Sequence, residues 1–415
     1  MKWINKGHEF DELGKIFEKN KDLLFLGNVE KAKSMKQKLS FLGANIYIPE
    51  KTYIHKNNII FGFIKDHLIK QHIKSSNTNL NNKTIIITGD YSNTIEQYLT
   101  KIGLKKNINY FISNNDQITF YDYQSEFTMK YLSIFSVYAY DKVYLPSNNI
   151  VTTSVCNLNC EACLNFNPYN KNKYHNNIDN LKRDIDIYFS NVDMVALLHV
   201  TGGEPTLYPQ LSDFLKYINN NYRNKIIDLV MPTNGIREIT DELCQTFNEC
   251  NMVIQVDNYL DAVPKYKNIY ENNIEKLIKY NVKTDIIPAG ERWNWVRAYP
   301  PKYDYSKLSD EENTSRFDMC GSYFSEIRNG RIYSCCYNGF AETANIADKL
   351  DDGDTFDLEK NSNKKALVEF RLKYNEKGFT SFCKKCNGLP PLNSEYIKPA
   401  EQVIGTISWN GEFDK

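Results

Sequence analysis

The sequence has little that would direct the protein to a nucleic acid or to a membrane. Its 415 residues contain 51 Lys and Arg against 51 Asp and Glu, so the formal net charge is zero and no basic excess favours a polyanionic partner. No apolar run approaches the length of a membrane-spanning helix, and the first residues lack the apolar core of a signal peptide. We therefore expect a cytoplasmic protein with no nucleic-acid and no membrane partner.

The sequence contains ten cysteines, and the expected cytosolic location bears on their role. In a cytosolic chain of this size, so many thiols indicate metal binding and not disulfides. None of the six histidines has a partner at metal-ligand spacing, so cysteine is the expected ligand type. Cys244 and Cys250 lie on or beside a helix-like run with apolar neighbours, which favours core packing.

Three cysteines follow a strand-like run, residues 150–155, in the spacing C-x3-C-x2-C. They are Cys156, Cys160 and Cys163. Three thiolates can hold three irons of a [4Fe–4S] cube and leave the fourth iron open for a ligand. A structural zinc site, the alternative, takes four ligands and usually two C-x2-C pairs, so it fits this loop poorly.

A second motif, Thr-Gly-Gly-Glu-Pro, occupies residues 201–205. Its two glycines allow a close approach of the backbone to a ligand, because neither carries a side chain. A carboxylate at Glu204 suits an ammonium group, and Pro205 stiffens the turn. Taken alone, the motif is equally typical of an ordinary Gly-Gly turn before a helix.

Together the two motifs resemble the radical S-adenosylmethionine (SAM) superfamily. The resemblance implies a [4Fe–4S] cluster on the three cysteines and a SAM molecule that chelates the open iron. It further implies cofactor contacts from Gly202, Gly203, Glu204, Pro205, Thr233, Asn234 and Gln255. The aromatic residue that the family usually has before the third cysteine is Ala162 here, so adenine packing is expected from Phe166 or Tyr169.

The chain is long enough for two or three domains, and its pattern predicts an α/β protein. Residues 1–115 alternate strand-like and helix-like runs, with a glycine after the strands at 23–26 and 84–88, which predicts a Rossmann-like open α/β domain. Residues 116–148 are rich in aromatics and are expected to connect and pack on both neighbours. Residues 149–315 resemble the family's partial (βα)6 barrel, with later strands near 195–200, 226–231, 252–257 and 282–287. No clear sixth strand stands out.

The remaining residues, 316–415, hold four further cysteines, Cys320, Cys335, Cys383 and Cys386. Asn329-Gly330 is a two-residue hairpin signal that would return Cys335 to the stem entered by Cys320. The spacing resembles the SPASM and twitch extensions of radical SAM enzymes, and the shorter twitch form implies one auxiliary [4Fe–4S] cluster. A structural zinc site with four cysteines is the alternative. Cys336 is interpreted as a spare thiol.

The resemblance implies that reductive cleavage of SAM gives a 5′-deoxyadenosyl radical, which abstracts hydrogen from a substrate. Electrons would come from a donor such as flavodoxin or ferredoxin. The α/β domain favours a small polar substrate, a carbohydrate, sugar nucleotide or related alcohol, undergoing oxidation, dehydration or epimerisation. Asp257, Trp293 and Arg297 are candidate substrate contacts. Two alternatives stay open, a peptide- or protein-modifying maturase and a non-enzymatic, zinc-stabilised binding protein.

Overall fold

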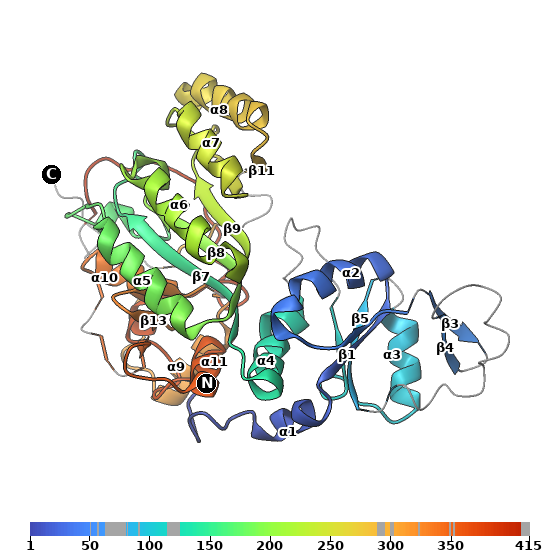
Figure 1. The fold of residues 1–415 in the computed structure, drawn as a ribbon. Helices are drawn as coiled ribbons and strands as arrows, with labels where there is room; N and C mark the ends of the chain where they lie inside the picture. The colour runs from blue at the N-terminus through green and yellow to red at the C-terminus, as the bar shows by residue number, and fades with distance from the viewer. Residues whose placement is uncertain are drawn as a thin grey trace.

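The computed structural model describes residues 1–49, 51–55, 58–62, 80, 82–89, 92–113, 125–288, 295–298, 303–322, 324–347, 350–351 and 353–407. Figure 1 shows a smaller lobe, coloured mainly blue, beside a larger lobe that runs from green to red. Within the described part of the chain, none of the helices combines the length and the apolar character that a membrane crossing requires.

The smaller lobe is built on a parallel four-stranded sheet with the order β2-β1-β5-β6. Its strands are β1 (Asp22–Gly27), β2 (Ile46–Tyr47), β5 (Lys83–Thr88) and β6 (Tyr110–Ile112), and its helices are α2 (Val29–Lys38) and α3 (Ser92–Lys101). A hairpin, β3 (Lys51–His55) with β4 (Asn58–Gly62), is attached to it. The predicted strand–glycine–helix units are confirmed, and Gly27 is required because a Cβ there would lie 2.0 Å from the Thr88 carbonyl oxygen.

Aromatic side chains join the two lobes. A π-helical turn (Phe127–Tyr131) leads into α4 (Leu132–Tyr140), which packs against α1 (Asp11–Lys19). The Phe135 ring lies edge-on to Phe17 at 5.3 Å between centroids, inside a core that continues into the larger sheet. Residues 127–145 of this region share a core with both lobes, whereas residues 116–124 lie outside the described part of the chain. However, the first strand of the larger sheet already begins at Tyr144, so the expected boundary at 148/149 falls inside a strand.

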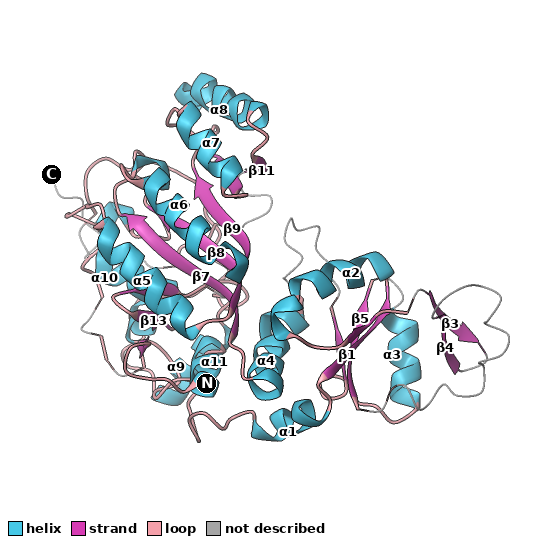
Figure 2. Ribbon diagram, in the orientation of Figure 1, coloured by secondary structure: helices cyan, strands magenta, loops and turns pink. Residues whose placement is uncertain are grey.

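The larger lobe contains one eight-stranded sheet with the order β11-β10-β9-β8-β7-β12-β13-β14. Its strands are β7 (Tyr144–Thr153), β8 (Met194–Gly202), β9 (Ile226–Thr233), β10 (Val253–Asn258), β11 (Lys283–Pro288), β12 (Glu326–Arg328), β13 (Arg331–Tyr333) and β14 (Thr355–Asp357). The helices between its first five strands are α5 (Ile178–Asn191), α6 (Leu211–Tyr222), α7 (Asp241–Glu249) and α8 (Lys267–Lys279). Helices α5 and α6 lie against one face of the sheet (Figure 2). Strands β7 to β11 are parallel, so the loops after them share one edge of the sheet.

The C-terminal region extends this same sheet. Strand β12 runs parallel to β7, and the β12–β13 turn has positive φ at Asn329 (53°) and Gly330 (69°), which confirms the predicted hairpin. The helices here are α9 (Asp310–Met319), α10 (Cys336–Thr343) and α11 (Lys364–Arg371). Among the described residues no sixth parallel strand lies beyond β11, and β12 instead pairs at the β7 side. The six-unit barrel and the domain limits stay predictions.

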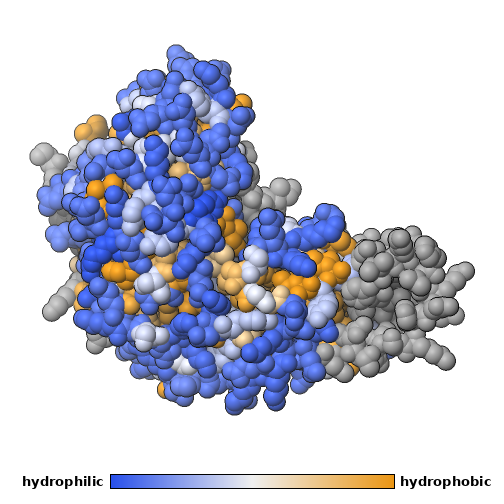
Figure 3. Space-filling view, in the orientation of Figure 1, coloured by the Kyte–Doolittle hydropathy of each residue, from blue (hydrophilic) through white to orange (hydrophobic). Residues whose placement is uncertain are grey.

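The first nine residues leave the smaller lobe and bind the larger one. The buried carboxylate of Glu369, on α11, accepts hydrogen bonds from the indole of Trp3 (2.7 Å) and the backbone N–H groups of Gly7 (2.6 Å) and Glu9 (2.8 Å). Figure 3 shows a mostly hydrophilic face on which hydrophobic residues gather where the lobes meet. The two lobes are therefore held by apolar packing and by this N-terminal segment.

Candidate active site

The cysteine loop and the Gly-Gly turn pack directly against each other at the ends of β7 and β8. A Cβ on Gly202 would lie 2.3 Å from the Thr153 carbonyl oxygen, and one on Gly203 would lie 2.4 Å from that of Val155. Such distances are far below any ordinary contact, so both positions need glycine for this approach. The amide of Asn165 also donates to the Gly202 carbonyl oxygen. The sequence analysis expected both motifs to contribute to one site. The structure shows that close backbone contacts require glycine at both positions.

Glu204 is the central link of these strand ends. Its side chain is only 1% exposed. One carboxylate oxygen accepts hydrogen bonds from Thr206 N–H (3.1 Å), Thr206 Oγ1 (2.7 Å) and Thr233 Oγ1 (2.8 Å), and the other accepts from Asn234 N–H (2.9 Å). Burial raises the pKa of Glu204, and these donors oppose that rise. Pro205 follows as the first residue of a short 3-10 turn that the carboxylate caps.

Asn234 completes the connection to the cysteine loop. Its side-chain amide donates to Oδ1 of Asn157 at 2.8 Å, between the first two cysteines, while its own Oδ1 accepts from Ile236 N–H. The ends of β7, β8 and β9 are therefore joined by a continuous set of hydrogen bonds. Thr233 and Asn234 were predicted as site residues, whereas the partner Asn157 was not.

Of the three cysteines of the loop, Cys160 is buried, and Cys156 and Cys163 are half-buried. Burial and, to a lesser degree, the neighbouring Cys163 raise the pKa of the Cys160 thiol to about 12. Burial also raises the pKa values of Cys156 and Cys163. Thiols in this setting need a cationic metal centre to be held as thiolates, since metal coordination deprotonates a thiol outright. The donor set thus fits a cluster.

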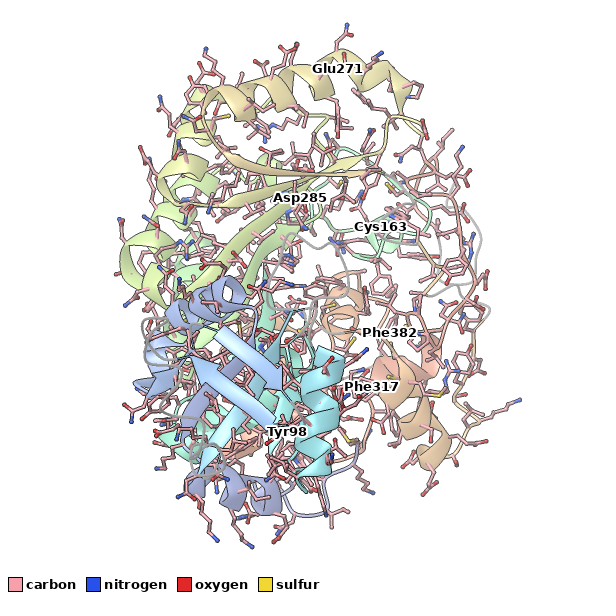
Figure 4. The ribbon with its side chains drawn as sticks, turned by 90° about the vertical axis from the view of Figure 1, so that its right-hand side faces the viewer. Tyr98, Cys163, Glu271, Asp285, Phe317 and Phe382 are labelled. Carbon is pink, nitrogen blue, oxygen red and sulfur yellow. The ribbon has the colours of Figure 1, made fainter. Side chains whose placement is uncertain are left out.

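Polar side chains of β10 and β11 reach the same edge of the sheet. Gln255 and Asp285 are paired in register and buried, and Asp257 follows on β10. Burial raises the pKa of Asp257 to about 7, although the Tyr259 hydroxyl donates to it at 3.0 Å. Figure 4 shows Asp285 and Cys163 on the same side of the molecule. The Asp257 carboxylate also raises the pKa of the Cys160 thiol, so a group that gains or loses a proton near neutral pH sits beside the cysteine loop.

Two other predicted contacts are differently placed. The Arg297 guanidinium is ion-paired with Glu161 (2.7 Å), inside the cysteine loop, and with Glu395 (3.4 Å), so its charge already has partners. Trp293 lies outside the described residues. Of the two residues expected to pack on adenine, Phe166 is fully buried and lies edge-on to Phe382 at 5.2 Å between ring centroids, and Tyr169 is buried as well.

The second cysteine set lines a single cavity. Cys320, Cys335, Cys383 and Cys386 all border it, and its volume is about 30 Å³. The sulfurs of Cys320 and Cys386 accept hydrogen bonds from Leu389 N–H and Gly388 N–H. Those of Cys335 and Cys383 are hydrogen-bonded to the hydroxyls of Ser322 and Thr380. Cys336 is not among the lining residues and begins α10, as its interpretation as a spare thiol requires.

The same cavity contains polar atoms that the protein leaves without a partner. Asn338 is fully buried and lines the cavity, yet neither its amide nitrogen nor its amide oxygen has a hydrogen-bond partner. Nε of Arg316, another lining residue, also lacks one. Buried polar groups are normally paired, so these atoms could bond to a polar group bound in the cavity. In the described part of the chain, no three His, Cys, Asp or Glu side chains are grouped closely enough to hold a single metal ion.

The C-terminal segment, residues 400–405, is the feature that the sequence did not reveal. The Gln402 amide donates to Sγ of Cys160 at 3.2 Å, although the two residues are 242 positions apart. The Glu401 carbonyl oxygen accepts from Glu161 N–H at 2.7 Å. No motif or spacing in this segment marks it as part of the site.

The family model of the radical SAM superfamily matches residues 150–297, which include the cysteine loop, the Gly-Gly turn and the ends of β9 and β10. Residues 150–297 form a radical SAM domain. This domain supports an enzyme of the radical SAM type, and the family implies a [4Fe–4S] cluster and SAM. The match ends before the second cysteine set, so the twitch-like extension and its cluster stay proposals.

Individual relatives are distant. The radical SAM domain is similar to a protein named "Probable GTP 3′,8-cyclase" from Methanococcus aeolicus, with 29% identity over 147 residues, 34% of this chain and 45% of that protein. The chain thus matches less than half the length of this relative.

Solved structures resemble the chain more weakly still. Native anSMEcpe with bound AdoMet gives a TM-score of 0.39 at 14% identity, covering 58% of this chain and 84% of that one. BtrN in complex with AdoMet and 2-DOIA gives 0.36 at 16%, covering 58% and 92%. Streptococcus suis SuiB bound to precursor peptide SuiA gives 0.28 at 16%, covering 56% and 52%. Likenesses this distant assign no substrate to the radical SAM domain.

Proposed function

We propose that the radical SAM domain holds a [4Fe–4S] cluster on Cys156, Cys160 and Cys163 and binds SAM beside it. The observation that carries the proposal is the joining of the cysteine loop, the Gly-Gly turn and Asn234 into one hydrogen-bonded unit. Three thiols leave one iron without a protein ligand, which is what SAM chelation requires. Gly202 and Gly203 would bring the backbone to SAM, with Thr233, Asn234 and Gln255 nearby.

When bound, the cluster and SAM would supply one-electron chemistry able to remove a hydrogen atom from a carbon of the substrate. The residues of this chain would position SAM and handle the protons of the substrate. Glu204 fixes the ends of β8 and β9 through its four hydrogen bonds, so the SAM contacts are preorganised. Asp257, with a pKa near neutrality, is placed to hold or release a proton of the substrate.

The second cysteine set is proposed to hold an auxiliary [4Fe–4S] cluster with all four irons ligated. Four thiols around one cavity, each with a hydrogen-bond partner, support this proposal, as do the unpartnered atoms of Asn338. Hydrogen bonds to cluster sulfur are a usual way in which proteins stabilise such centres. Zinc remains the alternative occupant. A fully ligated cluster has no site for SAM, so its role would be to carry electrons or shape the pocket.

The substrate is proposed to be a small polar molecule that donates hydrogen bonds through hydroxyl or amino groups. Asp257, near the end of β10, supplies a carboxylate acceptor, whereas Arg297 is already paired with carboxylates. The comparisons lend no support to a carbohydrate in particular. A peptide substrate is the alternative, and a reduced flavodoxin or ferredoxin is the proposed electron source.

Anaerobic reconstitution followed by a SAM-cleavage assay tests the proposed function. The unaltered protein should turn brown, bind iron and sulfide, and form 5′-deoxyadenosine under strong reduction. Cys160→Ala should abolish that product, whereas Cys244→Ala, a buried cysteine outside both sets, should keep it. Product formation by Cys160→Ala at the unaltered rate would refute the assignment.

A further inference from the structure

The cysteine loop is paired with the C-terminal segment 400–405. Val403 N–H donates to the Asn159 carbonyl oxygen at 2.9 Å, and Glu161 N–H donates to the Glu401 carbonyl oxygen at 2.7 Å. The Asn159 side-chain amide adds bonds to the carbonyl oxygens of Val403 (3.0 Å) and Gly405 (2.7 Å). Together with the bridge between Cys160 and Gln402, these contacts form a short antiparallel pairing. The conformation of the cysteine loop is therefore held in part by the C-terminal segment.

Within this pairing, the orientation of the Gln402 amide is determined by its neighbours. Its oxygen accepts from Asn159 N–H at 2.8 Å, and a backbone N–H cannot act as an acceptor. The nitrogen must then face the other way, where it donates to Sγ of Cys160 (3.2 Å) and to the Ala400 carbonyl oxygen (2.7 Å). Ala400 is fully buried in an apolar group with Leu158 and Cys160, which anchors the segment.

We propose that Gln402 is a positioning residue of the first cluster, which donates a hydrogen bond to the Cys160 thiolate and makes the cluster easier to reduce. Reduction adds one electron, and the negative charge on the ligand sulfurs grows. A donor at the sulfur stabilises the reduced form more than the oxidised form, so its loss lowers the reduction potential. The inference rests on the proposed function, because it requires a cluster on Cys160.

The test is a potentiometric titration of the reconstituted full-length protein, followed by electron paramagnetic resonance. The first-cluster signal is the one that changes when SAM is added. Gln402→Met keeps the length of the side chain and shields the sulfur from water but cannot donate. It should shift the reduction equilibrium about tenfold toward the oxidised form, which is about 59 mV for a one-electron couple.

Two further variants separate the hydrogen bond from general charge effects. Gln402→Glu keeps the acceptor for Asn159 N–H but places a negative oxygen against the sulfur, so its potential should fall further than that of Gln402→Met. Glu401→Gln removes a charge one position away without a side-chain contact to Cys160, and its potential should stay close to that of the unaltered protein.

Iron content and reduction potential together distinguish a failure of this inference from a failure of the proposed function. A Gln402→Met protein with full iron content and an unchanged potential would overturn the role of Gln402 while leaving the cluster in place. An unaltered protein that binds no iron on reconstitution would overturn the proposed function itself, and the inference with it.

Discussion

Glu204 and Asn234 are joined by a hydrogen bond of 2.9 Å from the Asn234 backbone N–H to the Glu204 carboxylate, which links the end of β8 to the end of β9. The Asn234 side chain continues the link to Asn157 in the cysteine loop. Because Glu204 is buried and both its oxygens accept hydrogen bonds, its first effect is to hold the Gly-Gly turn and the β9 end in one arrangement. Any contact with SAM adds to that effect.

The first prediction is that Glu204→Gln weakens SAM binding and leaves the iron content intact. The amide nitrogen of glutamine would face Asn234 N–H, donor against donor, so a charge-assisted bond of about 1.5–3 kcal/mol is lost. This bond is present with and without SAM, so its loss acts on binding through the displaced SAM contacts. The dissociation constant of SAM should rise by up to roughly a hundredfold in a binding titration. Glu242→Gln, an exposed change on α7, is the control, and equal affinity in both variants would remove Glu204 from the site.

The second prediction uses two adjacent cysteines. Reconstituted protein should hold about eight irons per chain if both sets carry a [4Fe–4S] cluster. Cys335→Ala should lower that toward about four, because Cys335 lines the cavity. Cys336→Ala should retain all of them, since its sulfur lies outside the lining. Equal iron loss in the two variants, or zinc in place of iron at this set, would contradict the assignment.

The third prediction concerns the buried carboxyl of Asp257. Its pKa is about 7 in the folded protein and about 4 when unfolded, so between these values the folded state binds more protons. The free energy of unfolding therefore falls as pH rises from about 4 to about 7. Asp257→Asn should remove its share of this fall, of order 1–3 kcal/mol given partial access of water, as measured by denaturant unfolding at both pH values. If the free energy of unfolding changed equally with pH in both proteins, the pKa of Asp257 would not be raised in the folded state.

The fourth prediction tests the N-terminal segment that joins the lobes. Glu369→Ala would leave the donors of Trp3, Gly7 and Glu9 without their acceptor, so the free energy of unfolding should drop by about 2–4 kcal/mol. Glu376→Ala removes an exposed ion pair with Lys6 in the same region and should cost less than about 1 kcal/mol. Similar denaturation midpoints would mean that the segment contributes little.

The sequence predicted the features that depend on short spacing. Cys156, Cys160 and Cys163 lie within eight residues, and the Asn329-Gly330 hairpin needs only its two positive-φ positions. The start of β7 at Tyr144 was missed because a strand buried on both faces shows no alternation of polar and apolar residues. Its aromatic residues therefore looked like part of the connector.

Contacts between residues that are far apart in the sequence could not be predicted from it. Gln402 meets Cys160 across 242 positions, and Arg297 meets Glu161 across 136, and neither pair carries a recognisable motif. The pairing of β12 with β7 was hidden for the same reason. Arg297 was consequently interpreted as a substrate contact, whereas it is ion-paired with the cysteine loop.

The most direct test of the central claim is whether SAM binds an iron of the first cluster. The protein to measure is the Cys383→Ala/Cys386→Ala variant, reconstituted and reduced without oxygen, so that only the cluster on Cys156, Cys160 and Cys163 contributes to the electron paramagnetic resonance spectrum. Adding SAM should change that spectrum, and 5′-deoxyadenosine should form slowly. A cluster spectrum that is identical with and without SAM would contradict the account.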